Sequence, residues 1–500
     1  MQPRRGVIAT VLVLASLALV IASMVVGGST SSAPRSSEPA TRSRATDAAI
    51  EAKGGSAEAE EEAGQTAERI QAWHKAKAAG TLRVQQAAAL AAPAAGWAGE
   101  QVISPTADDW EPAIAADPNS AYVYLLTTRY TGPTACGNKC PLPYIMLKVS
   151  SDGGATWGPD RYICTCAGVG AQADPIIEVV PNTGTVYAVF MNGYNVFFTK
   201  STDHGATWTT PVKTYGKVSW NDKPILATSD NGQDIYVSFN GPTGGDPYVA
   251  QSHDAGATWT QTKVVDSSRY FFAFDGDVLP NGTVVFSEAS LDYSGPGGSL
   301  VGQSQIDVIR SSNNGASWTN SVVDTVELSP VCTAAGCPDD YYPGHTAVSA
   351  DANGNLVLLY DGATTPNGND TVWSRRSSNG GATWSARQAL STSGEMGDFP
   401  AVESRGAGDV RAWYMQTNGG NFDAWNVWYR SSTDGGQTWA SPVKISDVTS
   451  GATYKTANGF LEPYGDYGEI AITNTGKTIG TWGEGNSYTG PGGTWVNRQT

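Results

Sequence analysis

The chain has little positive charge and few histidines. Its 500 residues include 31 Lys and Arg against 47 Asp and Glu, a net charge of -16, and only 4 His. The basic residues form no run beyond the extreme N-terminus. Because nucleic-acid-binding surfaces concentrate positive charge, we expect no nucleic acid partner. An acidic surface rich in Gly and Trp instead suits an extracellular domain that binds neutral or cationic ligands.

A long apolar run occurs at the N-terminus. Two arginines precede an apolar stretch from Gly6 to Val26, which is typical of a secretory signal or of an uncleaved membrane anchor. No small-x-small cleavage site decides between the two. In both cases the rest of the chain lies outside. Residues 1–28 therefore predict a protein that is secreted or anchored at the outer face of the cell membrane, with no other membrane contact.

Residues 29–95 contain few large apolar side chains. They are rich in Ala, Ser, Glu, Thr and Gly, a composition that buries too little surface to fold. Within them the stretch AEAEEEAGQTAERIQAWHKAKAAG has good helix formers, so we expect a spacer with one solvated helix. The folded domain is expected over residues 96–500.

One octapeptide, SSDGGATW from Ser150 to Trp157, recurs five more times in related form. The copies end at Trp208, Trp259, Trp318, Trp384 and Trp439. Repeats of roughly fifty residues with four short strands each are typical of propeller blades. The alternating β-branched and aromatic residues around each copy support such strands. The sequence therefore predicts an all-β chain built of repeated blades.

Seven first strands can be counted, but only six octapeptides. The last unit ends after three strands, and the segment GWAGEQVIS from Trp97 to Ser104 aligns with TWASPVKIS near Trp439. We therefore expect this N-terminal strand to complete the last blade, which leaves no unpaired edge at the junction. The predicted fold is a seven-bladed β-propeller of four-stranded antiparallel blades.

The pattern Ser-x-Asp-x-Gly-x-Thr-Trp has the chemistry of a turn. Asp and Ser or Thr side chains bond nearby backbone amides, Gly takes a positive φ, and Trp packs as an apolar plug. It resembles the Asp-box, or BNR repeat, of the sialidase-like β-propellers over about residues 96–500. The resemblance implies that the boxes join third to fourth strands, on the rim opposite the binding face. Asn313 and Asn379 replace Asp in two copies, as a structural turn tolerates.

Six cysteines fall in two clusters. An even number in an exported chain argues for disulfides, and because neither cluster has a nearby histidine, a metal site is disfavoured. Antiparallel strands around the first octapeptide favour a nested pairing over the crossed one. The expected disulfides are Cys140 with Cys164, Cys136 with Cys166, and Cys332 with Cys337.

A polar residue recurs at the entry to each innermost strand, where seven would ring the axial mouth. Clustered carboxylates raise one another's pKa and can act as acid and base, and they can also hold Ca²⁺; no other cofactor is indicated. An Asp before Pro is also an ordinary turn starter, so a scaffold role stays open for each. These residues are Glu111, Asp174, Asp222, Asp275 with Asp277, His345, Asp398 and Asp466.

The resemblance to sialidases implies three arginines for the substrate carboxylate, a Tyr–Glu nucleophile pair and an acid/base Asp. Arg129 and Arg269 are the two arginines expected on the functional rim, where a planar guanidinium suits a carboxylate. Tyr464 with Glu462 can imitate the nucleophile pair. The family's early Arg-Ile-Pro-like motif is absent, and WEPAI stands in its place.

Two hypotheses about function stay open. The first is a monomeric carbohydrate-active enzyme of glycoside hydrolase type, or a lyase, acting on a glycan through carboxylates at the axial mouth. The second is a non-catalytic propeller that binds glycan or protein at the cell surface. The catalytic candidates are Asp222, Asp398, Asp466, His345, Glu462 and Tyr464, and the substrate-binding candidates are Arg129, Arg269, Glu111, Asp174, Asp275 and Tyr342.

Overall fold

A computed structural model describes residues 91–164, 170–218, 221–241, 245–292, 294, 301–328, 344–452, 468–485 and 492–500, and five positions within 75–80. Lys75 and residues 77–79 are helical, within the stretch for which a spacer helix is predicted. In these ranges no helix combines the length and the apolar character needed to span a bilayer. The predicted signal or anchor, residues 1–28, lies outside them.

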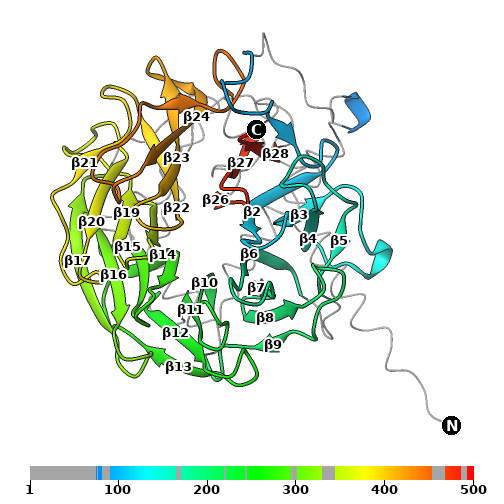
Figure 1. Cartoon of the computed structure of the whole chain (residues 1–500), viewed down its shortest axis with the longest axis horizontal. Helices are drawn as coiled ribbons and strands as arrows, with labels where there is room; N and C mark the ends of the chain where they lie inside the picture. Colours follow the sequence, from blue (N-terminus) through cyan, green and yellow to red (C-terminus); the bar gives the residue numbers. More distant parts are fainter. Residues whose placement is uncertain are drawn as a thin grey trace, which may run out of the picture. The chain divides into compact units, whose positions relative to one another are not determined.

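The described strands form seven sheets of four antiparallel strands. The innermost strands contact those of the next blade all the way around, so the blades form a ring (Figure 1). This confirms the predicted seven-bladed β-propeller. The first three blades are β2 (Asp108–Ala116), β3 (Val123–Thr131), β4 (Tyr144–Ser150), β5 (Arg161–Tyr162); β6 (Gln172–Val179), β7 (Val186–Asn192), β8 (Val196–Ser201), β9 (Val212–Lys213); and β10 (Asp222–Thr228), β11 (Ile235–Asn240), β12 (Pro247–Ser252), β13 (Thr260–Lys263).

The remaining four blades repeat this order from the axis outward. They are β14 (Tyr270–Val278), β15 (Val284–Leu291), β16 (Ser304–Ser311), β17 (Thr319–Val326); β18 (Thr346–Ala350), β19 (Leu356–Tyr360), β20 (Trp373–Ser377), β21 (Gln388–Ala389); β22 (Gly397–Ser404), β23 (Val410–Asn418), β24 (Asn421–Ser432), β25 (Val443–Lys444); and β26 (Glu469–Ile472), β27 (Thr478–Gly485), β28 (Gly492–Arg498), β1 (Gln101–Val102).

The N-terminal strand closes the ring, as the sequence predicts. β1 pairs antiparallel with β28, and a further bridge joins Trp97 to Gln499. Trp97 is buried and its ring packs edge-on against Tyr429 of the sixth blade, with 4.9 Å between ring centroids. The last blade is therefore built from both ends of the propeller domain, and its outer β28 edge is covered.

Apolar side chains fill the space between neighbouring blades. One cluster joins Phe198 of the second blade, Val237 of the third and Phe286 of the fourth. The octapeptide tryptophans Trp259 and Trp318 pack against the same cluster. Since burial of apolar area is the main favourable contribution to folding, these contacts hold the blades together and make the ring a rigid support for its loops.

The six octapeptides form the turns between third and fourth strands, and together they define what we call the box rim. In the first, Asp152 accepts hydrogen bonds from Thr156 N (2.9 Å) and Thr156 Oγ1 (2.6 Å), and Ser150 Oγ donates to Asp152. Asn313 and Asn379 keep the same turn but donate from Nδ2 to the hydroxyl of Ser317 and Thr383, both at 2.8 Å.

Box aspartates are fully occupied by the turn. Hydrogen bonds, first from the Thr207 hydroxyl, lower the pKa of Asp203 to about 2, and those first from Thr258 do the same for Asp254. Such groups are ionised at neutral pH and have no proton to donate. This chemistry supports the predicted structural role.

Neighbouring positions of one box are expected to respond oppositely to substitution. Ala255 has φ +56°, a left-handed conformation that Gly adopts without penalty, so Ala255→Gly is expected to stabilise the protein by about 0.5–1 kcal/mol. Gly256→Ala would place a Cβ 2.2 Å from Phe198 Cε1 and is expected to destabilise it by about 1–3 kcal/mol. Urea denaturation measures both. Equal losses of stability in the two variants would contradict this account of the turn.

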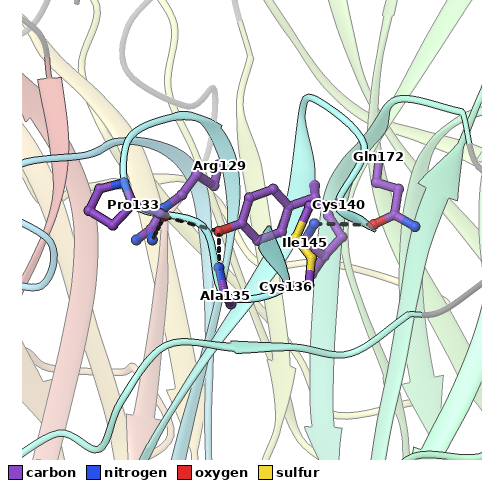
Figure 2. Close-up of a disulfide and its surroundings, with 8 residues drawn as sticks. Arg129, Pro133, Ala135, Cys136, Cys140, Ile145 and Gln172 are labelled. Atoms are coloured by element: carbon purple, nitrogen blue, oxygen red, sulfur yellow. Dashed lines mark hydrogen bonds between the residues drawn. A yellow bond between two sulfur atoms is a disulfide. The ribbon is translucent and has the colours of Figure 1, made fainter. Parts of the chain in front are cut away.

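The predicted nested disulfides are wrong. Cys136 is joined to Cys140 across the short 3-10 helix η1 (Gly137–Lys139), with 5.5 Å between their Cα atoms (Figure 2). The prediction extended the strand pairing into this segment, but β4 begins only at Tyr144, so Cys140 lies in a loop. Cys164 is also disulfide-bonded, whereas Cys166, Cys332 and Cys337 lie outside the described residues.

Candidate functional site

The innermost strands carry a bulge at their entry. Register shifts occur in β2, β6, β10 and β22, where Glu111, Asp174, Lys223 and Phe399 have φ near +50° and precede a proline. Non-glycine residues hold this conformation only where the surrounding structure imposes it. The bulge separates the predicted entry residues into two sets. Glu111 and Asp174 occupy the bulge itself, whereas Asp222 and Asp398 come one position earlier.

Glu111 bridges two blades. Its Oε2 accepts hydrogen bonds from Thr128 Oγ1 (2.5 Å) and from the backbone N–H of Asp174 in the next blade (2.9 Å), and the residue is buried. Asp174 and Asp222 are buried as well. The structure therefore places Glu111 and Asp174 at a blade junction and Asp222 buried at the start of β10.

Arg129 is fully buried. Its guanidinium donates to both oxygens of Asp109, at 2.6 and 2.7 Å, and also to Asp160, Ser104 and the carbonyl of Pro133. Figure 2 shows Arg129 beside Pro133. The planar guanidinium of Arg129 is therefore taken up by hydrogen bonds to these protein groups.

Arg269 has mainly neutral partners and is partly exposed. Its Nε donates to Ser290 Oγ at 3.0 Å, and its Nη2 donates to the carbonyls of Ser290 and Gln303. It lies in the fourth blade and Arg129 in the first, so the two predicted binding arginines are held by separate blades.

Three side chains from two neighbouring blades meet at the entry ends of the innermost strands β18 and β22. His345 precedes β18, Asp361 follows β19, and Asp398 belongs to β22. His345 Nδ1 lies 3.3 Å from Asp361 Oδ2 and 3.3 Å from Asp398 Oδ1. All three are buried, and the imidazole contacts the rings of Phe274 and Phe399, with centroids 5.0 and 4.2 Å away.

The two carboxyl groups of this cluster differ in environment. Asp361 accepts backbone N–H groups of Gly344 (2.8 Å), His345 (2.9 Å) and Phe399 (3.1 Å), which favour its ionised form. Burial, and next the charge of Asp361, raise the pKa of Asp398 well above its usual value. The raised pKa favours the protonated form of Asp398, which has fewer backbone donors than Asp361.

The same cluster is the group most suited by spacing to hold a cation. Within the described ranges, its ligand atoms all lie within 4.8 Å of one another. Both oxygens of Asp361, however, already accept backbone N–H groups. These bonds use most of the acceptor capacity of Asp361.

The axial channel holds a second set of carboxyl groups. A cavity of about 580 Å³ is lined by the innermost strands of all seven blades. Burial raises the pKa of Glu178 to about 8, of Asp275 to about 8 and of Asp277 to about 6. Burial and the neighbouring carboxylates likewise raise the pKa of Glu403 and Glu469 well above the usual value.

Several channel carboxylates cap the inner edge of the next blade. An innermost strand has no partner on its axial side, so its backbone N–H groups need other acceptors. Among the described residues that line this cavity, Arg405 is the one basic side chain. The capping pairs are Asp275 Oδ2 with Val348 N (2.9 Å), Asp277 Oδ2 with Ala350 N (2.7 Å) and Glu469 Oε2 with Ile114 N (2.6 Å).

Some predicted residues cannot be placed. Asp466, Glu462, Tyr464 and Tyr342 lie outside the described residues. Their proposed roles therefore stay predictions.

Sequence reasoning missed Asp361, Glu178, Glu403 and Glu469. An ionisable residue inside an apolar strand, as in IIEVV and AVESR, was a usable signal for Glu178 and Glu403, because alternation sends it to the channel. Asp361 follows the apolar run LVLLY at a strand end. Nothing in its local pattern distinguishes it from an ordinary turn residue.

Comparison with known proteins gives structural neighbours of low identity. No family model matches the chain, and no curated protein is a significant match. A Hadza microbial sialidase, Hz136, has a TM-score of 0.39 and 14% identity over 78% of this chain and 65% of its own. A polysaccharide lyase, the PL25 ulvan lyase, has a TM-score of 0.48 and 12% identity over 80% of this chain and 95% of its own.

A third neighbour is the intramolecular trans-sialidase from Ruminococcus gnavus. It has a TM-score of 0.42 and 12% identity, over 78% of this chain and 94% of its own. At these identities the similarity is one of fold and assigns no activity to this chain.

Proposed function

We propose that this chain is an exported, carbohydrate-acting propeller that hydrolyses a glycosidic bond by acid–base chemistry at the entry end of its channel. The observation that carries the proposal is His345, held 3.3 Å from each of Asp361 and Asp398. The carbohydrate class is supported by the six octapeptides, which resemble the Asp-box. Export is supported by the arginines and apolar run of residues 1–28.

The geometry suggests a division of labour. With Nδ1 3.3 Å from a carboxylate oxygen of each aspartate, a proton on Nδ1 would leave Nε2 as the basic atom of the ring. A water that adds to the anomeric carbon would give its proton to Nε2, an atom that is buried in this structure. The breaking glycosidic oxygen would take a proton from a carboxylic acid, the role that the raised pKa of Asp398 permits.

The closeness of Asp361 and Asp398 bears on the type of reaction. Glycosidases that use two independent carboxyl groups hold them roughly 5–10 Å apart, whereas these two act on one imidazole. Any catalytic group beyond His345 and Asp398 would therefore come from another segment, and Asp466, Glu462 and Tyr464 remain the candidates. Elimination at a uronic acid is the competing reaction, since one acid–base unit can remove a proton from the sugar and return a proton to the leaving oxygen.

Substitution of Asp398 tests the proposal. In a screen of polysaccharides and glycoconjugates, Asp398→Asn and His345→Gln are expected to lower kcat at least 100-fold, because each removes a proton carrier. Asp307→Asn, which neutralises a buried carboxylate of β16, serves as the control for folding and is expected to keep activity within about threefold. Saturated product ends identify hydrolysis.

Three outcomes would count against the proposal. Unsaturated uronic ends, detected by their short-wavelength ultraviolet absorbance, would replace hydrolysis by elimination. Full activity of both variants would remove the cluster from the chemistry. If glycans raise the Tm of the protein without being cleaved, the propeller is a binding module, a reading that the near-complete burial of His345 favours.

A further inference from the structure

A second cavity lies on the box rim, between the fifth and sixth blades. It has a volume of about 550 Å³, within the range of small-molecule sites. Arg376 and Trp384 line it from the fifth blade, Asn353 from the turn after β18, and Asp434 from the octapeptide of the sixth. The cavity is thus on the rim opposite His345.

Arg376 differs from its counterparts in other blades. The residue before the box serine is Lys200 in the second blade and Arg310 in the fourth, and each donates to a carbonyl of the next box, Ala255 O (2.8 Å) and Gly380 O (2.5 Å). The Arg376 stem packs in the same way, since a Cβ on Gly436 would lie 3.5 Å from its Cδ.

The guanidinium of Arg376, however, has no such acceptor. Among the described residues it makes no side-chain hydrogen bond or ion pair, although it is half-buried and lines the cavity. A guanidinium offers five N–H donors in a planar fork. The cavity is therefore lined by guanidinium donors that no described side chain or carbonyl accepts from, and by the Trp384 indole.

The charges around the cavity select the ligand. Asp351 and Asp434 line it and disfavour an anion, while their oxygens already accept hydrogen bonds from their own turns and, for Asp351, also from Gly408 N of the sixth blade. What remains for a ligand is Arg376, the amide of Asn353 and the indole of Trp384. This combination suits adjacent hydroxyl oxygens on a compact ring with an apolar C–H face.

We propose that the cavity beside Arg376 binds a neutral sugar unit, as an anchoring subsite separate from the channel entry. The choice of ligand class is consistent with the proposed function but does not depend on catalysis. The site would hold the propeller on a glycan chain through its box rim. The opposite rim would then stay free to act on substrate.

Binding to the full chain tests this inference. Isothermal titration with neutral tri- to hexasaccharides of glucose, mannose and galactose is expected to find one binding sugar, and Arg376→Gln to weaken its binding at least fivefold. Arg310→Gln is the matched control. Arg310 is the equivalent residue of the neighbouring fourth blade, and its guanidinium already donates to the carbonyl of Gly380. The affinity of Arg310→Gln for the sugar is expected to equal that of the unmodified protein.

Several results would overturn the subsite. They are unchanged affinity in Arg376→Gln, equal losses in both arginine variants, binding of sulfated or uronic sugars alone, or no binding to any neutral sugar of the panel. Arg376→Gln should retain turnover of short soluble substrates, whereas His345→Gln should retain the titrated affinity. Failure of the subsite is therefore distinguishable from failure of the proposed catalysis.

Discussion

Replacing Arg129 with Met is expected to lower the free energy of unfolding by about 3–5 kcal/mol, because it leaves a buried carboxylate without its cation. Asp109 is fully buried, and both of its oxygens accept from this guanidinium. Asp160 keeps a second partner, Lys148, at 2.7 Å. Most of the loss should therefore come from Asp109.

A double variant isolates the loss of stability that comes from the unpaired Asp109 carboxylate. Arg129→Met with Asp109→Asn is expected to be more stable than Arg129→Met alone, since the buried charge is removed together with its partner. Arg269→Met is the control: Arg269 is partly exposed and bonds mainly neutral groups, so it should cost no more than about 1 kcal/mol. Urea denaturation of the unmodified protein, the single variants Arg129→Met and Asp109→Asn, and the double variant gives the cycle. A loss below 1 kcal/mol in Arg129→Met would show that the ion pair is not a structural element.

Removing residues 1–104 is expected to unfold or aggregate the propeller, whereas removing residues 1–90 should leave it intact. The longer deletion takes away β1, together with the buried side chains of Trp97 and Ile103. Loss of large buried side chains costs about 2–5 kcal/mol each, against a total domain stability of about 5–15 kcal/mol. It also leaves the β28 edge without a partner.

Size-exclusion chromatography and thermal unfolding compare the two shortened proteins. The chain beginning at residue 91 keeps the hydrogen bond from Ala91 N to Asp447 O (2.7 Å) and the Trp97 contact with Tyr429, so its Tm should be within a few degrees of the full chain. A monomeric chain beginning at residue 105 with the same Tm would mean that β1 is dispensable for closure.

Local chemistry made much of the fold predictable. The octapeptide turn depends on residues within eight positions of one another, so its presence, its count and its spacing are all visible in the chain. The alignment of Trp97–Ser104 with the fourth strand near Trp439 also predicted the closure. Periodic patterns of this kind occur because each blade buries the same faces of its sheet against its neighbours.

The candidate site was less predictable. His345 and Asp398 were identified as candidates, but their meeting with Asp361 was not, because it depends on the ring bringing the fifth and sixth blades side by side. The bulges at Glu111 and Phe399 shift the entry residues by one position, and a shift of one residue turns a side chain to the other face.

The number of blades, the closure by the N-terminal strand and the structural role of the octapeptides were all predictable from the chain, because these features follow from repeated short-range patterns. Only the folded chain shows that Cys136 pairs with Cys140, that the Arg129 guanidinium is paired with Asp109, and that His345 lies between two carboxyl groups. Each of these depends on loop paths or on contacts between segments distant in the chain, and such contacts leave no trace in local composition or periodicity.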